Sequence, residues 1–96
     1  MYLAATSSGE LSATAAVYTG PCRLASVLVI TDGTNAGKVV IDDSTGGSGT
    51  VKYETTVVGA NHYGGRNWTF PVKFTTGIYV TLSGTGATFI VEWCSP

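Results

Sequence analysis

The chain has 96 residues, a net charge of −1 and 11% charged residues, against about 25% in an average soluble domain. A chain of this length forms a single domain that buries somewhat more than about 60% of its unfolded surface, so we expect an adequate core with a small margin of stability. The five Lys and Arg residues are scattered singly and offer no basic stripe to phosphates, and the longest apolar run, 27–30, is far below the roughly 20 residues of a membrane span. Neither nucleic acid nor a membrane is therefore an expected partner.

Alternation of apolar and polar residues dominates the sequence, and no segment has helical periodicity. We interpret residues 1–9 as a flexible N-terminal arm, in which 2–6 adds an eighth strand if it is ordered, and residues 10–96 as one domain. The predicted strands after the arm are 11–17, 22–31, 39–41, 51–58, 68–74, 78–83 and 88–93. The short connection 75–77 predicts a hairpin between the fifth and sixth of these strands.

Gly-rich segments separate the strands, among them "DGTNAG", "DDSTGGSGT" and "GANHYGGRN". Many short strands with such turns and no helix are typical of sandwiches and closed all-β folds. The sequence therefore predicts an all-β fold, an antiparallel β-sandwich or jelly-roll-like domain of seven to eight short strands with no helix of note.

The alternation also assigns side chains to the inside or the outside. In 22–31 the parity of Cys22 and Leu24 predicts that Leu28 points inward, which leaves Val27 and Val29 outside. Because both parities are apolar at 27–30, this strand is either central and covered on both sides or in contact with another subunit. The residues expected to point inward in the second half of the chain are Val51, Tyr53, Thr55, Val57, Trp68, Phe70, Val72, Phe74, Ile78, Val80, Leu82, Phe89, Val91 and Trp93.

The two cysteines are expected on opposite faces, Cys22 inside and Cys94 outside. Paired neighbouring strands place opposed side chains on one face, so a disulfide between these residues needs a bulge or non-neighbouring positions. We therefore expect two free thiols. No metal site is expected either, because there is no Cys pair at metal-ligand spacing and a single histidine cannot complete a zinc set.

The sequence contains no group of residues typical of a catalytic site. His62 is the only histidine, and no motif for nucleophilic catalysis surrounds it. Asp42 and Asp43 are adjacent and so point to opposite faces of a strand, whereas acid–base catalysis needs groups that converge. The segment 42–49 lacks the ligand spacing of an EF-hand and is interpreted as a polar turn. We expect no catalytic residues, no metal and no cofactor, and a protein that is not an enzyme.

The segment 60–68, "ANHYGGRNW", is interpreted as a long turn that contacts a partner. Its aromatic, Arg, Asn and His side chains are types that provide contact area and hydrogen bonds at interfaces. Trp68 has inward parity and is also a candidate core residue, and a solvated turn or a sugar-binding loop are alternatives for the segment. The candidate partner-binding residues are Asn61, His62, Tyr63, Arg66, Trp68 and Tyr79.

Three groups of residues resemble a known group of proteins. They are a Gly-Pro-x-Arg-Leu opening at Gly20, Pro21, Arg23 and Leu24, then Phe74, Thr75, Gly77, Ile78, Tyr79 and Val80, and a Gly-Thr-Gly turn at 84–86. With these features the segment 20–93 resembles small all-β virion proteins of tailed bacteriophages. The segment 59–68 departs from that pattern, which has a shorter connection there.

The resemblance implies a structural component of a virus particle without catalytic residues. It would be a head decoration or cement protein that binds the major capsid protein or another virion protein, or else part of a tail, collar or fibre. Its localisation would be the virion, assembled in the host cytoplasm.

The residues indicate an assembly subunit independently of the resemblance. A thin core, few charges and apolar outward positions such as Val27, Val29, Val58 and Ile90 favour a subunit stabilised by its neighbours, hence a homo-oligomer such as a trimer. Edge strands or the arm 1–9 would then lie across a neighbour.

A carbohydrate-binding or host-adhesion module of a phage tail or fibre is the alternative. Tyr63 and Tyr79 would then stack on sugar rings, and Asn61, His62 and Arg66 would bond to hydroxyl groups. Exposure of Tyr63 and Arg66 in the assembled particle would favour adhesion, and their burial against a neighbour would favour clamping.

Overall fold

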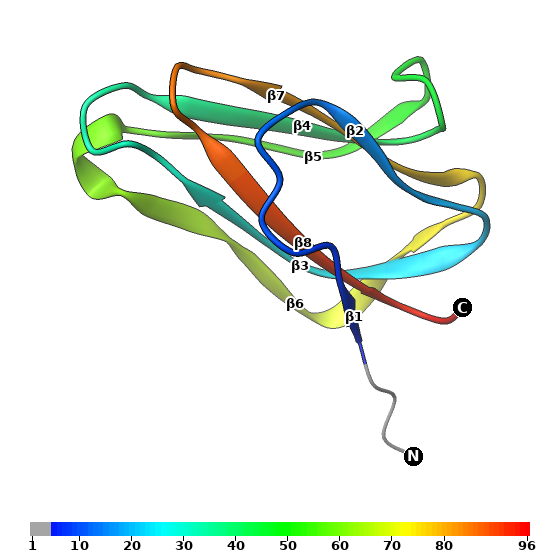
Figure 1. Cartoon of the computed structure of the whole chain (residues 1–96). Helices are drawn as coiled ribbons and strands as arrows, with labels where there is room; N and C mark the ends of the chain where they lie inside the picture. The colour runs from blue at the N-terminus through cyan, green and yellow to red at the C-terminus, as the bar shows by residue number, and fades with distance from the viewer. Residues whose placement is uncertain (1–4) are drawn as a thin grey trace.

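The computed structural model describes residues 5–96 as two four-stranded antiparallel β-sheets that pack face to face (Figure 1). Among the described residues the one helical segment is a single 3₁₀ turn, η1 (Gly59–Asn61). The predicted all-β sandwich is confirmed. The strands are β1 (Thr6–Ser7), β2 (Ala15–Thr19), β3 (Cys22–Ile30), β4 (Gly37–Asp43), β5 (Thr50–Val57), β6 (Tyr63–Phe74), β7 (Gly77–Ser83) and β8 (Thr88–Cys94).

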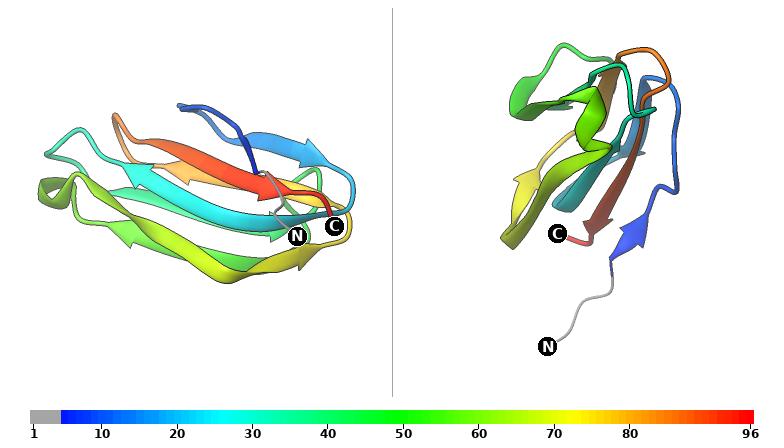
Figure 2. Two further views of the ribbon diagram at one scale, coloured as in Figure 1. Left: turned by 90° about the horizontal axis from the view of Figure 1, so that it is seen from below. Right: turned by 90° about the vertical axis from the view of Figure 1, so that its left-hand side faces the viewer.

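Each strand of the first half of the chain pairs with a strand of the second half. One sheet, here the β3 sheet, has the order β1-β8-β3-β6, and the other, the β4 sheet, has the order β2-β7-β4-β5. The pairs β1/β8, β2/β7, β3/β6 and β4/β5 join the two halves, and β3/β8 and β4/β7 complete the sheets. Among the eight described strands only β4 and β5 are consecutive in one sheet, so the other connections cross between sheets (Figure 2).

The core lies between the two sheets and takes side chains from both. The predicted inner faces of β7 and β8 are confirmed, because Ile78, Val80, Phe89 and Val91 are fully buried. Removal of such side chains from water is the main favourable term in folding. The buried cluster consists of Cys22, Leu24, Val27, Val29, Val39, Ile41, Val57, Phe74, Ile78, Val80, Phe89 and Val91.

A β-bulge interrupts β3 at Ala25. Leu24 and Ser26 lie two steps apart on β3, yet their partners on β8 are the neighbours Trp93 and Glu92. One strand therefore contains an extra residue at this level, which turns the side chains that follow to the opposite face.

The bulge determines which alternate residues of the apolar run 27–30 in β3 point into the core. Val27 and Val29 are 3% and 0% exposed, whereas Leu28 is 37% exposed. The faces predicted for 27–30 were therefore wrong, since strict alternation from Cys22 does not continue past the bulge.

A larger irregularity lies in β6 at the same level. The β6 partners of Leu24 and Ser26 are Val72 and Asn67, so the four residues between these two have no partner on β3. Phe70 is one of the four, and it is 86% exposed. Its assignment to the core was wrong because alternation does not hold through an unpaired segment.

The start of β5 departs from the prediction in the same way. The β4/β5 pairing shifts register between Ile41 and Asp42, which lie opposite Tyr53 and Val51. Val51 was expected inside and is 52% exposed, while Val57 at the other end of β5 is buried as predicted.

The predicted hairpin between β6 and β7 does not form, because these strands belong to different sheets. The two residues that join them, Thr75 and Thr76, form an arch anchored on Asp43 of β4. The Asp43 carboxylate accepts hydrogen bonds from the N–H groups of Thr75 (3.0 Å), Thr76 (2.8 Å) and Gly77 (3.2 Å), and from the Thr75 hydroxyl (3.0 Å). The partly exposed carboxylate at the end of β4 thus fixes the point at which the chain changes sheets.

Both cysteines are free, as predicted, and both are buried. Cys94 was expected outside but is 8% exposed. It lines a small cavity of about 150 Å³ together with Cys22, Tyr18 and Trp93. Thr6 of β1 and Pro21 of the β2–β3 turn line the same cavity, and strand parity alone does not reveal that these segments lie beside the end of β8.

The predicted arm, 1–9, includes residues 1–4, which lie outside the described residues. Its remaining part contains β1, in which Thr6 lies opposite Trp93. The Ser8 N–H donates to the Val91 carbonyl at 2.8 Å and extends this contact with β8.

Loss of the Asp43 carboxylate should destabilise the fold in a pH-dependent manner. Burial acts to raise the pKa of Asp43, but the hydrogen bonds from Thr75, Thr76 and Gly77 outweigh it and lower the pKa from 3.8 to about 2. A pKa depressed by folding gives stability that is present above the unfolded pKa and is lost as the pH falls through the folded pKa.

We therefore expect Asp43→Asn to lower the free energy of unfolding near neutral pH by about 1–2 kcal/mol, a value reduced for partial exposure of the group. The difference from the unmodified protein should shrink as the pH falls from about 4 towards about 2. Urea unfolding near neutral pH and at a pH of about 2 measures this difference in the free energy of unfolding, with substitution of the exposed Glu54, Glu54→Gln, as the control. An equal loss of stability at neutral and at acid pH would contradict this role of Asp43.

The thiols should react slowly in the folded protein. Burial raises the pKa of the Cys22 thiol to about 11, with smaller contributions from Asp43 and Cys94, so little thiolate is present at mildly alkaline pH. We expect two thiols per chain to react promptly with a thiol reagent in denaturant and Cys22 to react much more slowly without it. No reaction in denaturant would indicate a disulfide.

Candidate functional site

Residues 60–68 are the end of a turn followed by a strand, not the long turn that the sequence predicts. The turn closes at His62, and β6 begins at Tyr63. Gly64 and Gly65 are paired residues within β6. Glycine serves here for close approach between strands and not as a turn residue.

The turn before β6 is locked to the turn that follows β3. The Thr31 N–H donates to the His62 carbonyl at 2.7 Å, and the Thr31 hydroxyl donates to the Gly59 carbonyl at 2.7 Å. His62 has a φ of 63°, and its ring lies against Gly33, where an added Cβ would be 2.7 Å from the imidazole Cε1. His62 is therefore exposed but held in one place by a neighbouring turn.

Trp68 closes the sandwich at the edge where β5 and β6 meet. Its ring packs edge-on against Tyr53 of β5, with 5.1 Å between the ring centroids. The Arg66 guanidinium carbon lies 5.4 Å from the centre of the Trp68 ring, an arrangement worth about 0.5–1 kcal/mol at an exposed site. Trp68 is thus partly buried and works mainly as a packing residue, and it also fixes the position of Arg66.

The outer face of the β3 sheet contains an open groove, called here the β3–β6 groove, with a volume of about 540 Å³. It runs over parts of β3, β6 and β8. The residues that line it are Ser26, Val27, Leu28, Tyr63, Gly64, Gly65, Arg66, Asn67, Ile90 and Glu92.

The groove exists because Gly65 has no side chain. Leu28 lies opposite Gly65 on β6 and opposite Ile90 on β8, so these three residues form one row across the sheet. Tyr63 and Asn67 are two residues before and after Gly65 and project from the same face. The gap between them is floored by the apolar side chains of Leu28 and Ile90.

Gly65 cannot be replaced without disturbing the pairing. An added Cβ would collide with the carbonyl oxygen of Val27 on β3, and the φ of Gly65 is 153°. Gly64 is similarly restricted, because a Cβ there would approach Val57 Cγ2 at 2.5 Å. The shape of the groove therefore follows from backbone packing.

The groove has a polar end at the next row of the sheet. The Ser26 hydroxyl donates to Glu92 Oε1 at 2.7 Å, and Asn67 lies opposite Ser26. Arg66 borders the same region from β6. An apolar floor with a few polar groups at its border is a usual composition for a binding surface.

The outer face of the β4 sheet has a different character. Val40 lies between Thr81 and Glu54, and Lys38 lies in the row of Ser83 on β7. This face thus has more hydroxyl and charged groups than the outer face of the β3 sheet, and its one exposed large apolar side chain among the described residues is Val51, opposite Asp42.

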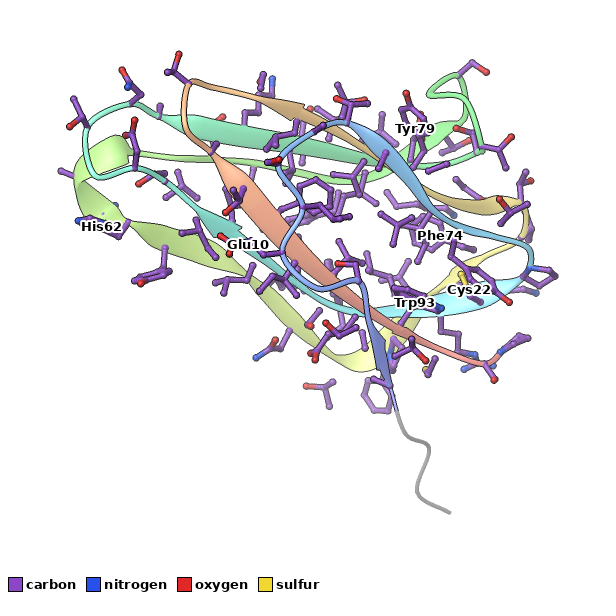
Figure 3. All side chains as sticks on the ribbon, viewed as in Figure 1. Glu10, Cys22, His62, Phe74, Tyr79 and Trp93 are labelled. Atoms are coloured by element: carbon purple, nitrogen blue, oxygen red, sulfur yellow. The ribbon has the colours of Figure 1, made fainter. Side chains whose placement is uncertain are left out.

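The structure brings together some of the predicted contact residues and separates others. Tyr63 and Arg66 line the groove, and Asn61 and His62 are exposed in the adjoining turn. Tyr79 belongs to β7 of the other sheet. It lies far from His62 (Figure 3) and packs under the β4–β5 turn, where a Cβ at Gly47 would be 2.9 Å from its ring.

Sequence reasoning missed Leu28 and Phe70 as surface residues. For Leu28 a signal existed. All four residues of 27–30 are apolar, and successive residues of a strand point to opposite faces, so apolar side chains had to lie on the outer face of the strand as well as on its inner face. For Phe70 there was no such signal, because its apolar neighbours at even spacing continue the pattern of a core strand.

Substitution of Gly65 tests the origin of the groove. We expect Gly65→Ala to lower the free energy of unfolding by about 1–3 kcal/mol, because the new Cβ forces Val27 and β6 apart. Gly46→Ala is the matched control: an added Cβ there meets no atom within 4 Å, and the change should stay within about 0.5 kcal/mol. Urea unfolding measures both, and equal effects would contradict close approach at Gly65.

Other features of the chain do not point to a specific chemistry. In the part of the chain that the structure describes, no three His, Cys, Asp or Glu side chains are grouped so that they could hold a metal ion. Residues 5–96 include no helix long and apolar enough to cross a membrane. Comparisons with protein-family models, with curated proteins and with solved structures gave no match to the chain.

Proposed function

We propose that the protein is a non-enzymatic structural protein of a phage particle, which decorates or cements the capsid by binding adjacent shell subunits. The contact surface in this proposal is the side of the sandwich that contains β6 and the outer face of the β3 sheet. The resemblance of 20–93 to small phage virion proteins gives the biological setting, and the distribution of exposed apolar side chains gives the surface.

The exposed apolar side chains carry the proposal. Three of the six exposed large apolar side chains, Leu28, Tyr63 and Phe70, lie on β3 and β6 of the β3 sheet, and Phe70 is the most exposed at 86%. Large apolar side chains gathered on one side of a small domain usually mark an interaction surface. In the described residues, the exposed large apolar side chains are Tyr18, Leu28, Val51, Val58, Tyr63 and Phe70.

β6 is also suited to backbone pairing with another chain. It is the last strand of its sheet and, at 12 residues, the longest strand of the eight described. Its only charged residues are Arg66 and Lys73, so it has little of the charge that usually protects an edge strand. A shell subunit could therefore add a strand here and cover Phe70 at the same time.

The strand order supports a jelly-roll description of this sandwich. The pairs β1/β8, β2/β7, β3/β6 and β4/β5 are those of one long hairpin folded into two sheets. Jelly rolls occur in viral capsid and lectin domains. Since a fold does not determine a function, this order supports the capsid role and its alternative equally.

The alternative is a carbohydrate-binding or host-adhesion module of a phage tail or fibre. One observation favours it: the β3–β6 groove combines the ring of Tyr63, which is 63% exposed, with the polar groups of Asn67 and Glu92. An exposed ring beside hydrogen-bonding groups is suited to a sugar.

Removal of Phe70 should weaken attachment to capsid shells. We expect Phe70→Ser to reduce binding to purified shells that lack the protein by about tenfold or more, as loss of a central apolar contact does at protein interfaces. Thr81→Ala, on the outer face of the β4 sheet, is the control and should bind normally. Co-sedimentation with the shells measures both.

Two results would contradict the capsid role. One is shell binding by Phe70→Ser that equals that of the unmodified protein. The other is no shell binding together with specific signals on a glycan array, which would favour the adhesion module.

A further inference from the structure

We propose that the β3–β6 groove receives residues 1–4 of a second copy of this chain, so that copies associate through their N-terminal segments. The inference names a partner for the surface described above and rests on the proposed assembly role for its purpose. Its test, however, needs no capsid shell.

The groove suits a short, uncharged and apolar segment. Its floor consists of Leu28 and Ile90, one wall is the exposed ring of Tyr63, and the missing side chain of Gly65 leaves room between that wall and Asn67. A volume of about 540 Å³ exceeds the space of a single side chain. Two of its polar groups, Ser26 and Glu92, are hydrogen-bonded to one another, and no side chain of the described residues covers the apolar floor beside them.

Residues 1–4 have the matching chemistry. They are Met1, Tyr2, Leu3 and Ala4, none of which has a charged side chain. Burial of a Tyr and a Leu side chain on an apolar floor is the kind of contact that drives association.

The direction of β1 places its N-terminal end away from the floor of the groove. Thr6 lies opposite Trp93 and Ser7 opposite Glu92, and the two strands are antiparallel, so β1 begins near Cys94, where β8 ends. β1 lies at the border of the β3 sheet beside the C-terminal end of β8 (Figure 1). The groove lies in the opposite direction along the strands, at the level of Ile90.

Reach alone does not separate the segment from its own groove. Ile90 lies one strand across and three residues along from Thr6, or about 11 Å, and the chain from Thr6 to Met1 spans at most about 17 Å when fully extended. To enter its own groove, the chain before β1 would have to reverse the direction of that strand, which leaves less than this length for the contact. A second copy has no such restriction.

Self-association across a concentration series tests the inference. We expect the full chain to associate in sedimentation experiments, and a variant that lacks residues 1–4 to have an association constant lower by about tenfold or more. Leu28→Glu, which places a charge on the groove floor, should have the same effect. Val51→Glu is the matched control, because Val51 is 52% exposed but lies on the other sheet, and it should associate normally.

A titration guards against misfolded variants. A synthetic peptide with the sequence of residues 1–5 is added to the truncated protein while the NMR signals of Leu28, Ile90 and Tyr63 are followed. We expect saturable shifts at these residues and none at Val51. Competition by the same peptide should dissociate the full chain.

Several outcomes would overturn the inference. Unchanged association after truncation would show that the segment is not needed, and a peptide that shifts no groove residue would show that it does not bind there. Groove signals that depend on residues 1–4 at every concentration would mean that the segment occupies its own groove. Association as predicted without any shell binding would leave this inference standing and contradict the proposed capsid role alone.

Discussion

The bulge at Ala25 is the constraint on which the surface of this protein depends. β3 lies inside its sheet between β8 and β6, so a single extra residue there changes the facing of side chains relative to both neighbours. It turns Val27 and Val29 into the core and Leu28 out of it. Without the bulge the outer face would present two small valines where it now presents the larger leucine, in the same row as Ile90 and Gly65. The groove, and the apolar character of this face, follow from that local change.

Magnitudes indicate why such a surface favours association. Full burial of one large apolar side chain is worth about 1.5–3 kcal/mol. Leu28, Tyr63 and Phe70 are 37%, 63% and 86% exposed, so a partner that covered them could contribute roughly 3–6 kcal/mol of transfer free energy before the costs of association. This approaches the lower end of the total stability of about 5–15 kcal/mol that is usual for a folded domain. The proposed contacts would therefore change the stability of the assembled subunit substantially, whereas surface charges, being few, would change it little.

Much of the fold could be predicted from the sequence, because alternation reports directly on faces wherever the pairing is regular. The inner faces of β7 and β8 were correct for this reason, and the two free cysteines were as expected. The errors lie where an interaction between segments far apart in the sequence determines which way a side chain faces or which strand the chain enters next. The bulge cannot be recognised from the sequence, because every residue of 27–30 is apolar and a change of face therefore does not alter the pattern. The connection Thr75–Thr76 has the length of a hairpin loop, and only the carboxylate of Asp43, more than thirty residues earlier in the chain, makes it an arch between sheets.

The candidate site was only partly predictable for the same physical reason. Gly64 and Gly65 were interpreted as turn residues, whereas they are strand residues that permit β6 to approach β3 and Val57. Tyr79 follows the segment 60–68 closely in the sequence and was predicted to point outward, but it belongs to the other sheet. The predicted contact residues are therefore divided between two faces of the sandwich. Tyr63 and Arg66 border the groove, yet its floor comes from β3 and β8, and no local pattern links these strands to β6.

The most direct test of the account is hydroxyl-radical footprinting of the protein, isolated and in the assembled particle. The account predicts that Leu28, Tyr63 and Phe70 are oxidised readily in the isolated protein and become protected on assembly, while Thr81 and Glu54 on the outer face of the β4 sheet remain as reactive as before. Protection of the β4 sheet with unchanged oxidation of Tyr63 and Phe70 would contradict it.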